Sequence, residues 1–141
     1  MGVITRVQPL AILVIDGHEE SARAMTGLLQ GEGHSVTLAS GFADALAAAA
    51  LMGPIDLIVC DVALPDGHGC ALLRLLRERR DGPPRHAIAL TGHSGDGWLQ
   101  EYQRAGYQRS LPKPVVFADL LVAVRLCRPW PRPGARDTDA G

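Results

Sequence analysis

The sequence predicts an α/β fold in which a five-stranded parallel sheet is covered by helices on both faces. Apolar runs of strand length alternate with helical patterns along the chain, and most of these runs are continuous. Continuous apolar runs are typical of strands that are buried on both faces, as in parallel sheets. With 141 residues, 47% of them hydrophobic, the chain is long enough for one domain with a proper core.

Five segments are expected to be strands, beginning with "LAILVI", "SVTLA" and "IDLIVC", and followed by "HAIAL" and the weaker "YQRSL". They span residues 10–15, 35–39, 55–60, 86–90 and 107–111. Helices are expected over residues 18–30, 41–52, 69–79, 95–105 and 116–127. The last of these matches the i, i+3, i+4, i+7 template, and the second is alanine-rich and stops at Gly53-Pro54. We interpret the apolar stripes of these helices as core packing.

This alternation of strands and helices implies right-handed crossovers between parallel strands. Five units fit a flavodoxin-like (βα)5 sheet of order 2-1-3-4-5 better than a larger dinucleotide fold. No G-x-G-x-x-G follows the first strand, which argues against a nucleotide cofactor. We expect an N-terminal lead over residues 1–9, one domain over 10–127 and a disordered Pro-rich tail over 128–141.

Bulk properties exclude several functions. A net charge of −1 creates no basic field for nucleic acid or membrane surfaces. There is no apolar run of about 18 residues and no signal-peptide pattern, so we expect a cytoplasmic protein without a membrane span. The cysteines, Cys60, Cys70 and Cys127, have no C-x-x-C spacing and are expected to be free, buried thiols.

Polar residues mark the ends of four expected strands. Asp16 ends the first, Asp61 the third and Thr91 the fourth, while Lys113 follows the fifth. The carboxyl ends of parallel strands share one edge, so these groups can converge. Carboxylates suit Mg²⁺ and can attack phosphorus, and Thr and Lys can stabilise a transferred phosphoryl group. Taken singly, Thr91 is more simply a helix cap and Lys113 a surface lysine.

Three histidines fall near the same edge: His18, His68 and His93. Their spacing includes no H-x-x-x-H pair and does not favour metal ligation.

On these residues the chain resembles the receiver domains of bacterial two-component response regulators, over about residues 10–127. The motifs are "ILVIDGHEES", "CDVALPDGHG", "IALTGHS" and "LPKPV". The separations between Asp16, Asp61, Thr91 and Lys113 are 45, 30 and 22 residues, which match the usual spacing of the family.

The resemblance implies a role for each matching position. Asp61 would be the phosphoacceptor, and Mg²⁺ would be held by Asp16, by Asp61 and by the backbone carbonyl of Ala63. Thr91 would donate to a phosphoryl oxygen, and Lys113 would pair with it. The Lys113–Pro114 bond would be cis, which costs roughly 0.5–1 kcal/mol for an X-Pro bond.

The resemblance also implies partners. A histidine kinase or phosphotransfer protein would supply the phosphoryl group, and the domain would catalyse transfer to its own aspartate without being a conventional enzyme. We expect no direct contact with nucleic acid or membrane, and at most a weak homodimer. Because only the tail follows residue 127, we expect a stand-alone receiver or one taken from a larger protein such as a hybrid histidine kinase.

Two positions depart from the family pattern. Gly17 stands where receivers usually carry a second acid that binds Mg²⁺ directly, so weak Mg²⁺ binding is expected; Glu19 and Glu20 more simply face the helix dipole. Ser110 stands where receivers usually carry Tyr or Phe, and we expect the usual conformational switch to be impaired. Tyr107 is not expected to substitute, because an odd offset along a strand places it on the opposite face.

Two other functions compete with phosphoryl acceptance. A phosphorylation-independent protein-binding module is favoured by Gly17 and Ser110 and opposed by the retained Asp61, Thr91 and Lys113. An aspartyl phosphatase would need an acid two residues after its nucleophile, and neither Asp61-Val62-Ala63 nor Asp16-Gly17-His18 supplies one.

Overall fold

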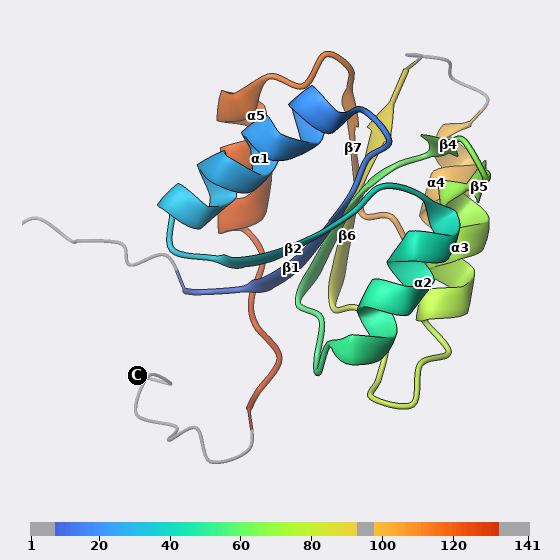
Figure 1. Cartoon of the computed structure of the whole chain (residues 1–141), viewed down its shortest axis with the longest axis horizontal. Helices are drawn as coiled ribbons and strands as arrows, with labels where there is room; N and C mark the ends of the chain where they lie inside the picture. Colours follow the sequence, from blue (N-terminus) through green and yellow to red (C-terminus); the bar gives the residue numbers. More distant parts are fainter. Residues whose placement is uncertain (1–7, 93–97, 133–141) are drawn as a thin grey trace, which may run out of the picture.

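The computed structural model of the chain describes residues 8–92 and 98–132. Five parallel strands form its main sheet: β1 (Ala11–Ile15), β2 (Ser35–Ala39), β3 (Leu57–Asp61), β6 (His86–Thr91) and β7 (Arg109–Pro112). Their order is β2-β1-β3-β6-β7 (Figure 1). This is the predicted 2-1-3-4-5 order, since β6 and β7 are the fourth and fifth strands of the sheet, and the flavodoxin-like α/β class is confirmed.

Five helices pack on the two faces of the sheet: α1 (Glu19–Gly31), α2 (Phe42–Leu51), α3 (Gly69–Leu76), α4 (Leu99–Ala105) and α5 (Phe117–Arg125). Figure 1 shows α1 and α5 on one face and α2, α3 and α4 on the other. Each face has its own apolar cluster. Along β1, Leu13 and Ile15 enter the α2–α4 cluster, whereas Ile12 and Val14 enter the α1–α5 cluster. Burial on both faces explains why this strand is apolar throughout.

Several boundaries differ from the predicted ones. Strand β3 starts at Leu57 and includes Asp61 as its last residue, and α3 stops at Leu76. A small antiparallel hairpin, β4 (Ala63–Leu64) with β5 (Gly67–His68), was not predicted, because two-residue strands have no apolar periodicity. The fourth helix was expected over residues 95–105, and residues 95–97 lie outside the described residues, as does His93. Within the described residues, α4 begins at Leu99.

The expected position of Tyr107 is wrong. Helix α4 ends at Ala105 and is capped by Gly106, whose φ of 118° is left-handed, and pairing of β7 with β6 starts only at Arg109. Tyr107 therefore precedes the strand, and the alternation of faces does not apply to it. Its ring is buried in the α2–α4 cluster, and its hydroxyl donates a 2.8 Å hydrogen bond to the Gly69 carbonyl.

Residues 128–132 lie against the end of the sheet opposite to the strand carboxyl ends. The Trp130 N–H donates to the Asp56 carboxylate at 2.7 Å, and the Trp130 indole donates to the Pro83 carbonyl at 3.1 Å. This part of the expected disordered tail therefore has defined contacts, whereas residues 133–141, like residues 1–7, lie outside the described part.

The predicted free thiols are confirmed: Cys60 and Cys70 are buried, and Cys127 is partly buried. Burial raises the pKa of Cys60 to about 12 and that of Cys127 to about 11, so both remain protonated at neutral pH. Among the described helices, none has the length and apolarity needed to span a membrane.

Candidate functional site

Three buried polar residues meet at the carboxyl edge of the sheet. Asp16 directly follows β1, Asp61 ends β3 and Thr91 ends β6, with exposed fractions of 2%, 5% and 5%. The neighbouring strand positions are fully buried and apolar, so the sheet carries each polar group into the interior at its end. This is the edge at which open α/β sheets bind ligands.

Lys113, in the loop after β7, completes the pocket. Its Nζ donates to Asp61 Oδ2 at 2.8 Å and lies 3.5 Å from Asp16 Oδ1. Burial by itself would lower the pKa of Lys113, but the hydrogen bond to Asp61 and the negative charges of Asp16 and Asp61 outweigh it, so the pKa is raised. The side chain is therefore a fixed cation that bridges two carboxylates at neutral pH.

The main chain holds Lys113 in this position. The Lys113 N–H donates to the Thr91 carbonyl at 2.8 Å, which joins the ends of β6 and β7. The Lys113–Pro114 bond is cis, as predicted. The sequence pattern predicted that Asp16, Asp61, Thr91 and Lys113 lie at one edge of the sheet, and the structure places all four residues at that edge.

A tight turn aims the Asp61 side chain. Asp61 Oδ1 accepts the Ala63 N–H at 2.9 Å, and the Val62 carbonyl accepts the Gly69 N–H at 2.8 Å. A Cβ at Gly69 would lie only 2.8 Å from Val62 Cα and 3.2 Å from the Asp61 carbonyl oxygen. Glycine is required because the start of α3 packs directly on the backbone that carries Asp61.

Asp16 has an unused acceptor. Its Oδ1 accepts the His18 N–H at 2.9 Å, whereas its Oδ2 is buried and has no hydrogen-bond partner in the described structure. An unsatisfied buried charged oxygen is costly, typically by about 1–3 kcal/mol or more. This oxygen therefore fits a cation ligand.

His18 belongs to the same cluster, which the histidine spacing did not indicate. One ligand atom from each of Asp16, His18 and Asp61 lies within 4.8 Å of the others, and His18 Nδ1 is 3.8 Å from Asp16 Oδ1. The only sequence signal was the Asp16-x-His18 spacing at the strand end, which is uninformative until Asp61 is known to be adjacent.

The acids that follow the first strand do not join this cluster. Glu19 forms an i, i+4 ion pair with Arg23 at 2.6 Å on the surface of α1. At Gly17, a Cβ would lie 3.3 Å from the ring of Pro65, which is tighter than most Cβ contacts, so a side chain at this position requires a small shift of that ring. Among the described residues, the pocket thus has two carboxylates, one imidazole and one ammonium within reach.

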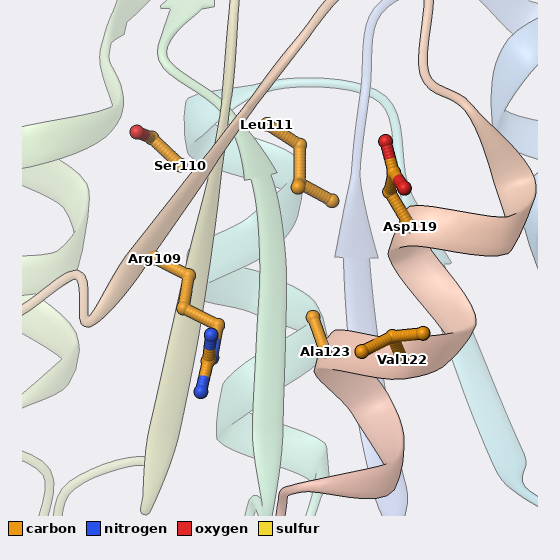
Figure 2. Close-up of a pocket in the computed structure, with 6 residues that line it drawn as sticks. All are labelled: Arg109, Ser110, Leu111, Asp119, Val122 and Ala123. Atoms are coloured by element: carbon orange, nitrogen blue, oxygen red, sulfur yellow. The ribbon is translucent and has the colours of Figure 1, made fainter.

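A separate pocket of about 410 Å³ lies between β7 and α5. It is lined by Arg109, Ser110, Leu111, Asp119, Val122 and Ala123. Figure 2 shows the Ser110 side chain pointing to the opposite side of β7 from Leu111 and Asp119. Ser110 therefore faces the side of the sheet covered by α2–α4, on which Tyr107 is also buried. No aromatic ring occupies position 110 itself.

The comparisons with known proteins agree with this fold. A family model, response regulator receiver domain, matches residues 12–125. Because this match covers most of the chain, the protein belongs to the receiver domain family of response regulators.

Two curated relatives illustrate the family. An uncharacterized 14.6 kDa protein of Leptolyngbya boryana is 34% identical over 84% of this chain and 88% of its own length. The probable transcriptional regulatory protein TcrX of Mycobacterium tuberculosis is 38% identical over 95% of this chain and 55% of its own length. The chain thus spans about half the length of some curated relatives.

Two solved structures share the fold. A CheY-like receiver domain protein from Methanospirillum hungatei superposes with a TM-score of 0.75 at 26% identity, over 84% of this chain and 93% of that one. The chemotaxis protein CheY4 of Vibrio cholerae superposes with a TM-score of 0.79 at 23% identity, over 86% of this chain and all of that one.

Proposed function

We propose that this chain is a phosphoacceptor domain that takes a phosphoryl group from a phosphohistidine of a histidine kinase or phosphotransfer protein. The observation that carries the proposal is the contact of 2.8 Å between Lys113 Nζ and Asp61 Oδ2 at the ligand-binding edge of the sheet. A carboxylate oxygen of Asp61 attacks phosphorus in line, the N–P bond breaks, and the imidazole of the donor leaves with the electron pair. The product is an acyl phosphate on Asp61.

The remaining residues stabilise charge in this reaction. The Lys113 ammonium offsets negative charge on the phosphoryl oxygens, and the Thr91 hydroxyl donates a hydrogen bond to one of them. The Ala63 N–H holds Asp61 Oδ1, which fixes the orientation of the carboxylate. A bound Mg²⁺, held by Asp16, Asp61 and the Ala63 carbonyl, would supply further neutralisation of phosphoryl charge.

The partner can approach over a groove next to Lys113. This groove, of about 300 Å³, is lined by residues of α1 and of the loop into α5: Glu20, Ser21, Ala24, Met25, Lys113, Pro114, Val115 and Phe117. Its lining is mostly apolar, with Glu20 at the entrance to α1. We propose that a helix of the phosphodonor protein docks here and presents its phosphohistidine to Asp61.

A phosphorylation-independent binding module is the second candidate. It is favoured by Gly17, which supplies no direct metal ligand, and by Ser110, which supplies no ring for the usual switch. Such a module would use the same surfaces without chemistry at Asp61.

Intact-mass analysis after incubation with acetyl phosphate and Mg²⁺ tests the proposal. The expected result is a gain of one phosphoryl group by the wild type and by Asp66→Asn, and none by Asp61→Asn. Asp66 is a matched control because it is a nearby exposed acid that accepts the N–H groups of Phe42 and Ala43 at the start of α2. Phosphorylation of Asp61→Asn would refute the assignment. A folded wild type that is never modified would favour the binding module.

A further inference from the structure

The acidic pocket offers an unusual set of metal ligands. Where a second acid would stand, Gly17 has no side chain, and Glu19 is paired with Arg23. Among the His, Cys, Asp and Glu side chains of the described residues, the third ligand atom within reach of Asp16 and Asp61 is an imidazole nitrogen of His18.

We infer that His18 replaces the missing acid as a metal ligand and that the pocket therefore binds a first-row transition ion in preference to Mg²⁺. The inference rests on the proposed function, because both use the pocket around Asp61. It concerns which ion the pocket selects and which residue makes the selection.

Local structure places His18 well for this role. It is the N-cap residue of α1, and its N–H donates to Asp16 Oδ1 at 2.9 Å, which keeps its backbone beside the carboxylate. The side chain itself is 77% exposed and His18 Nδ1 lies only 3.8 Å from Asp16 Oδ1. The ring can therefore turn toward a bound ion without disturbing the core.

A second, independent feature points to a cation at the same place. Asp16 Oδ2 is buried and has no partner in the described structure. Lys113 does not satisfy it, because its Nζ lies near Oδ1 of Asp16 and bonds to Oδ2 of Asp61. The two carboxylates and the one ammonium leave the pocket with a net negative charge, which a divalent ion compensates.

Ligand chemistry decides which ion this is. Mg²⁺ is a hard ion that prefers oxygen ligands and dehydrates reluctantly. Imidazole suits borderline ions of the first transition row, and affinity for mixed nitrogen and oxygen sites rises from Mn²⁺ through Co²⁺. A site with two carboxylates and one imidazole has less negative charge than a site with three carboxylates, and this disfavours Mg²⁺. The imidazole nitrogen in turn favours Co²⁺, Zn²⁺ or Fe²⁺.

The test is calorimetric titration of the untagged, metal-free full chain with Mg²⁺ and with Co²⁺, in the absence of a phosphodonor. Visible absorption of bound Co²⁺ provides a second readout, because its position and intensity change with the ligand set and the coordination number. The variants are His18→Ala, Asp61→Asn and the matched control His68→Asn. His68 is another exposed histidine near the pocket, whose Nδ1 caps α3 by accepting the Cys70 N–H, and asparagine retains that cap.

The wild type should bind Co²⁺ more tightly than Mg²⁺. His18→Ala should weaken Co²⁺ binding by about 10-fold to 100-fold and change the visible spectrum of the bound ion. Loss of a residue that only hydrogen-bonds to a metal ligand already lowers affinity by this factor, and loss of the ligand itself should cost at least as much. Mg²⁺ affinity should change by less than about twofold, since Mg²⁺ does not depend on the imidazole. His68→Asn should behave as the wild type, and Asp61→Asn should weaken both ions.

Equal Co²⁺ affinity in the wild type and His18→Ala would overturn the inference. So would an equal loss in His68→Asn, or Co²⁺ binding that is insensitive to Asp61→Asn, because the ion would then lie elsewhere. The experiment involves no phosphoryl transfer. A wild type that binds Co²⁺ through His18 but is never phosphorylated would refute the proposed function alone, and a phosphorylated wild type that is indifferent to His18 would refute this inference alone.

Discussion

The guanidinium of Arg132 forms a bidentate ion pair with the carboxylate of Asp56, with Nη2–Oδ2 and Nη1–Oδ1 distances of 2.6 Å and 3.1 Å. Asp56 is fully buried directly before β3, at the end of the sheet opposite to Asp61, and also accepts the N–H groups of Ala11 and Trp130. The Arg85 guanidinium stacks over the Trp130 ring at 4.9 Å. These contacts attach residues 128–132 to the domain.

Arg132→Ala should lower the free energy of unfolding by about 2 kcal/mol, because it removes charged hydrogen bonds to a buried carboxylate. The measurement is urea unfolding followed by circular dichroism. Arg128→Ala is the control, since Arg128 is exposed and contacts His86 through its backbone N–H. Equal midpoints for the two variants would show that the Asp56 pair does not contribute to stability.

Tyr107→Phe should destabilise the domain by roughly 1–2 kcal/mol, because it removes the buried hydrogen bond from the Tyr107 hydroxyl to the Gly69 carbonyl. Tyr102→Phe is the control: Tyr102 is buried in the same cluster, but its hydroxyl makes no hydrogen bond within the described residues. Thermal unfolding of both variants measures the difference. If Tyr102→Phe costs as much as Tyr107→Phe, the hydrogen bond to Gly69 is not the cause.

Stability should fall at mildly acidic pH through His34. Burial lowers the pKa of His34 below its ordinary value of 6.5, although Glu32 acts in the opposite direction, and Nδ1 accepts the Leu10 N–H at 3.0 Å. A lowered pKa in the folded state means that the unfolded state binds the proton more readily. The contribution of His34 is therefore complete above pH 6.5 and is lost as the pH falls through the folded pKa.

His34→Asn, in which the amide oxygen can accept the same N–H, removes this titration. Urea midpoints at about pH 7.5 and about pH 5 should differ less in this variant than in the wild type. An equal acid sensitivity in both proteins would assign the effect to other groups, of which His86, whose pKa is also lowered by burial, is the first to examine.

Gly17→Asp should raise Mg²⁺ affinity, because it supplies the third carboxylate that a hard ion prefers. The new Cβ would approach the Pro65 ring at 3.3 Å, so Gly17→Ala serves as the control for packing. Calorimetric titration with Mg²⁺ separates the two effects. If Gly17→Ala also binds Mg²⁺ more tightly, the gain in affinity comes from a stiffer backbone and not from the new carboxylate. If Gly17→Asp gives no gain in Mg²⁺ affinity, the pocket already has a full set of ligands.

Activation should move α4 little, because Ser110 has no ring that can be buried in one state and exposed in another. Burial of such a ring contributes roughly 1.5–3 kcal/mol, comparable with a typical allosteric coupling of about 1–3 kcal/mol. Trp98, whose ring stacks on His68 with a centroid distance of 5.6 Å, reports on the start of α4. Trp130→Phe makes Trp98 the only tryptophan of the chain.

In that background, beryllium fluoride with Mg²⁺ should leave Trp98 fluorescence nearly unchanged, and Ser110→Tyr should increase the response. A large change with Ser110 in place would point to another coupling residue, and Tyr107 would be the first candidate. Its hydroxyl reaches Gly69, directly behind the backbone of Asp61.

Much of the fold could be predicted from local signals. Continuous apolar strands, amphipathic helices and short loops led to the sheet order that the structure shows. Boundaries were predicted less well where tertiary contacts set them. Tyr107 was expected in the last strand, but Gly106 caps α4 and pairing of β7 with β6 starts only at Arg109, so Tyr107 precedes the strand. Residues 128–132 also escaped prediction, because Arg132 is an ordinary basic residue until it meets the buried Asp56.

The sequence by itself determined the fold class and brought Asp16, Asp61, Thr91 and Lys113 to one edge, because strand ends in a parallel sheet converge whatever the details of packing. Only the tertiary structure decided that His18 joins the two acids, that Glu19 turns away to Arg23, and that Asp16 keeps a buried oxygen without a partner. The reason is physical. Periodicity reports which face of an element is buried, whereas ligand sets depend on distances between side chains of different elements, which only packing determines.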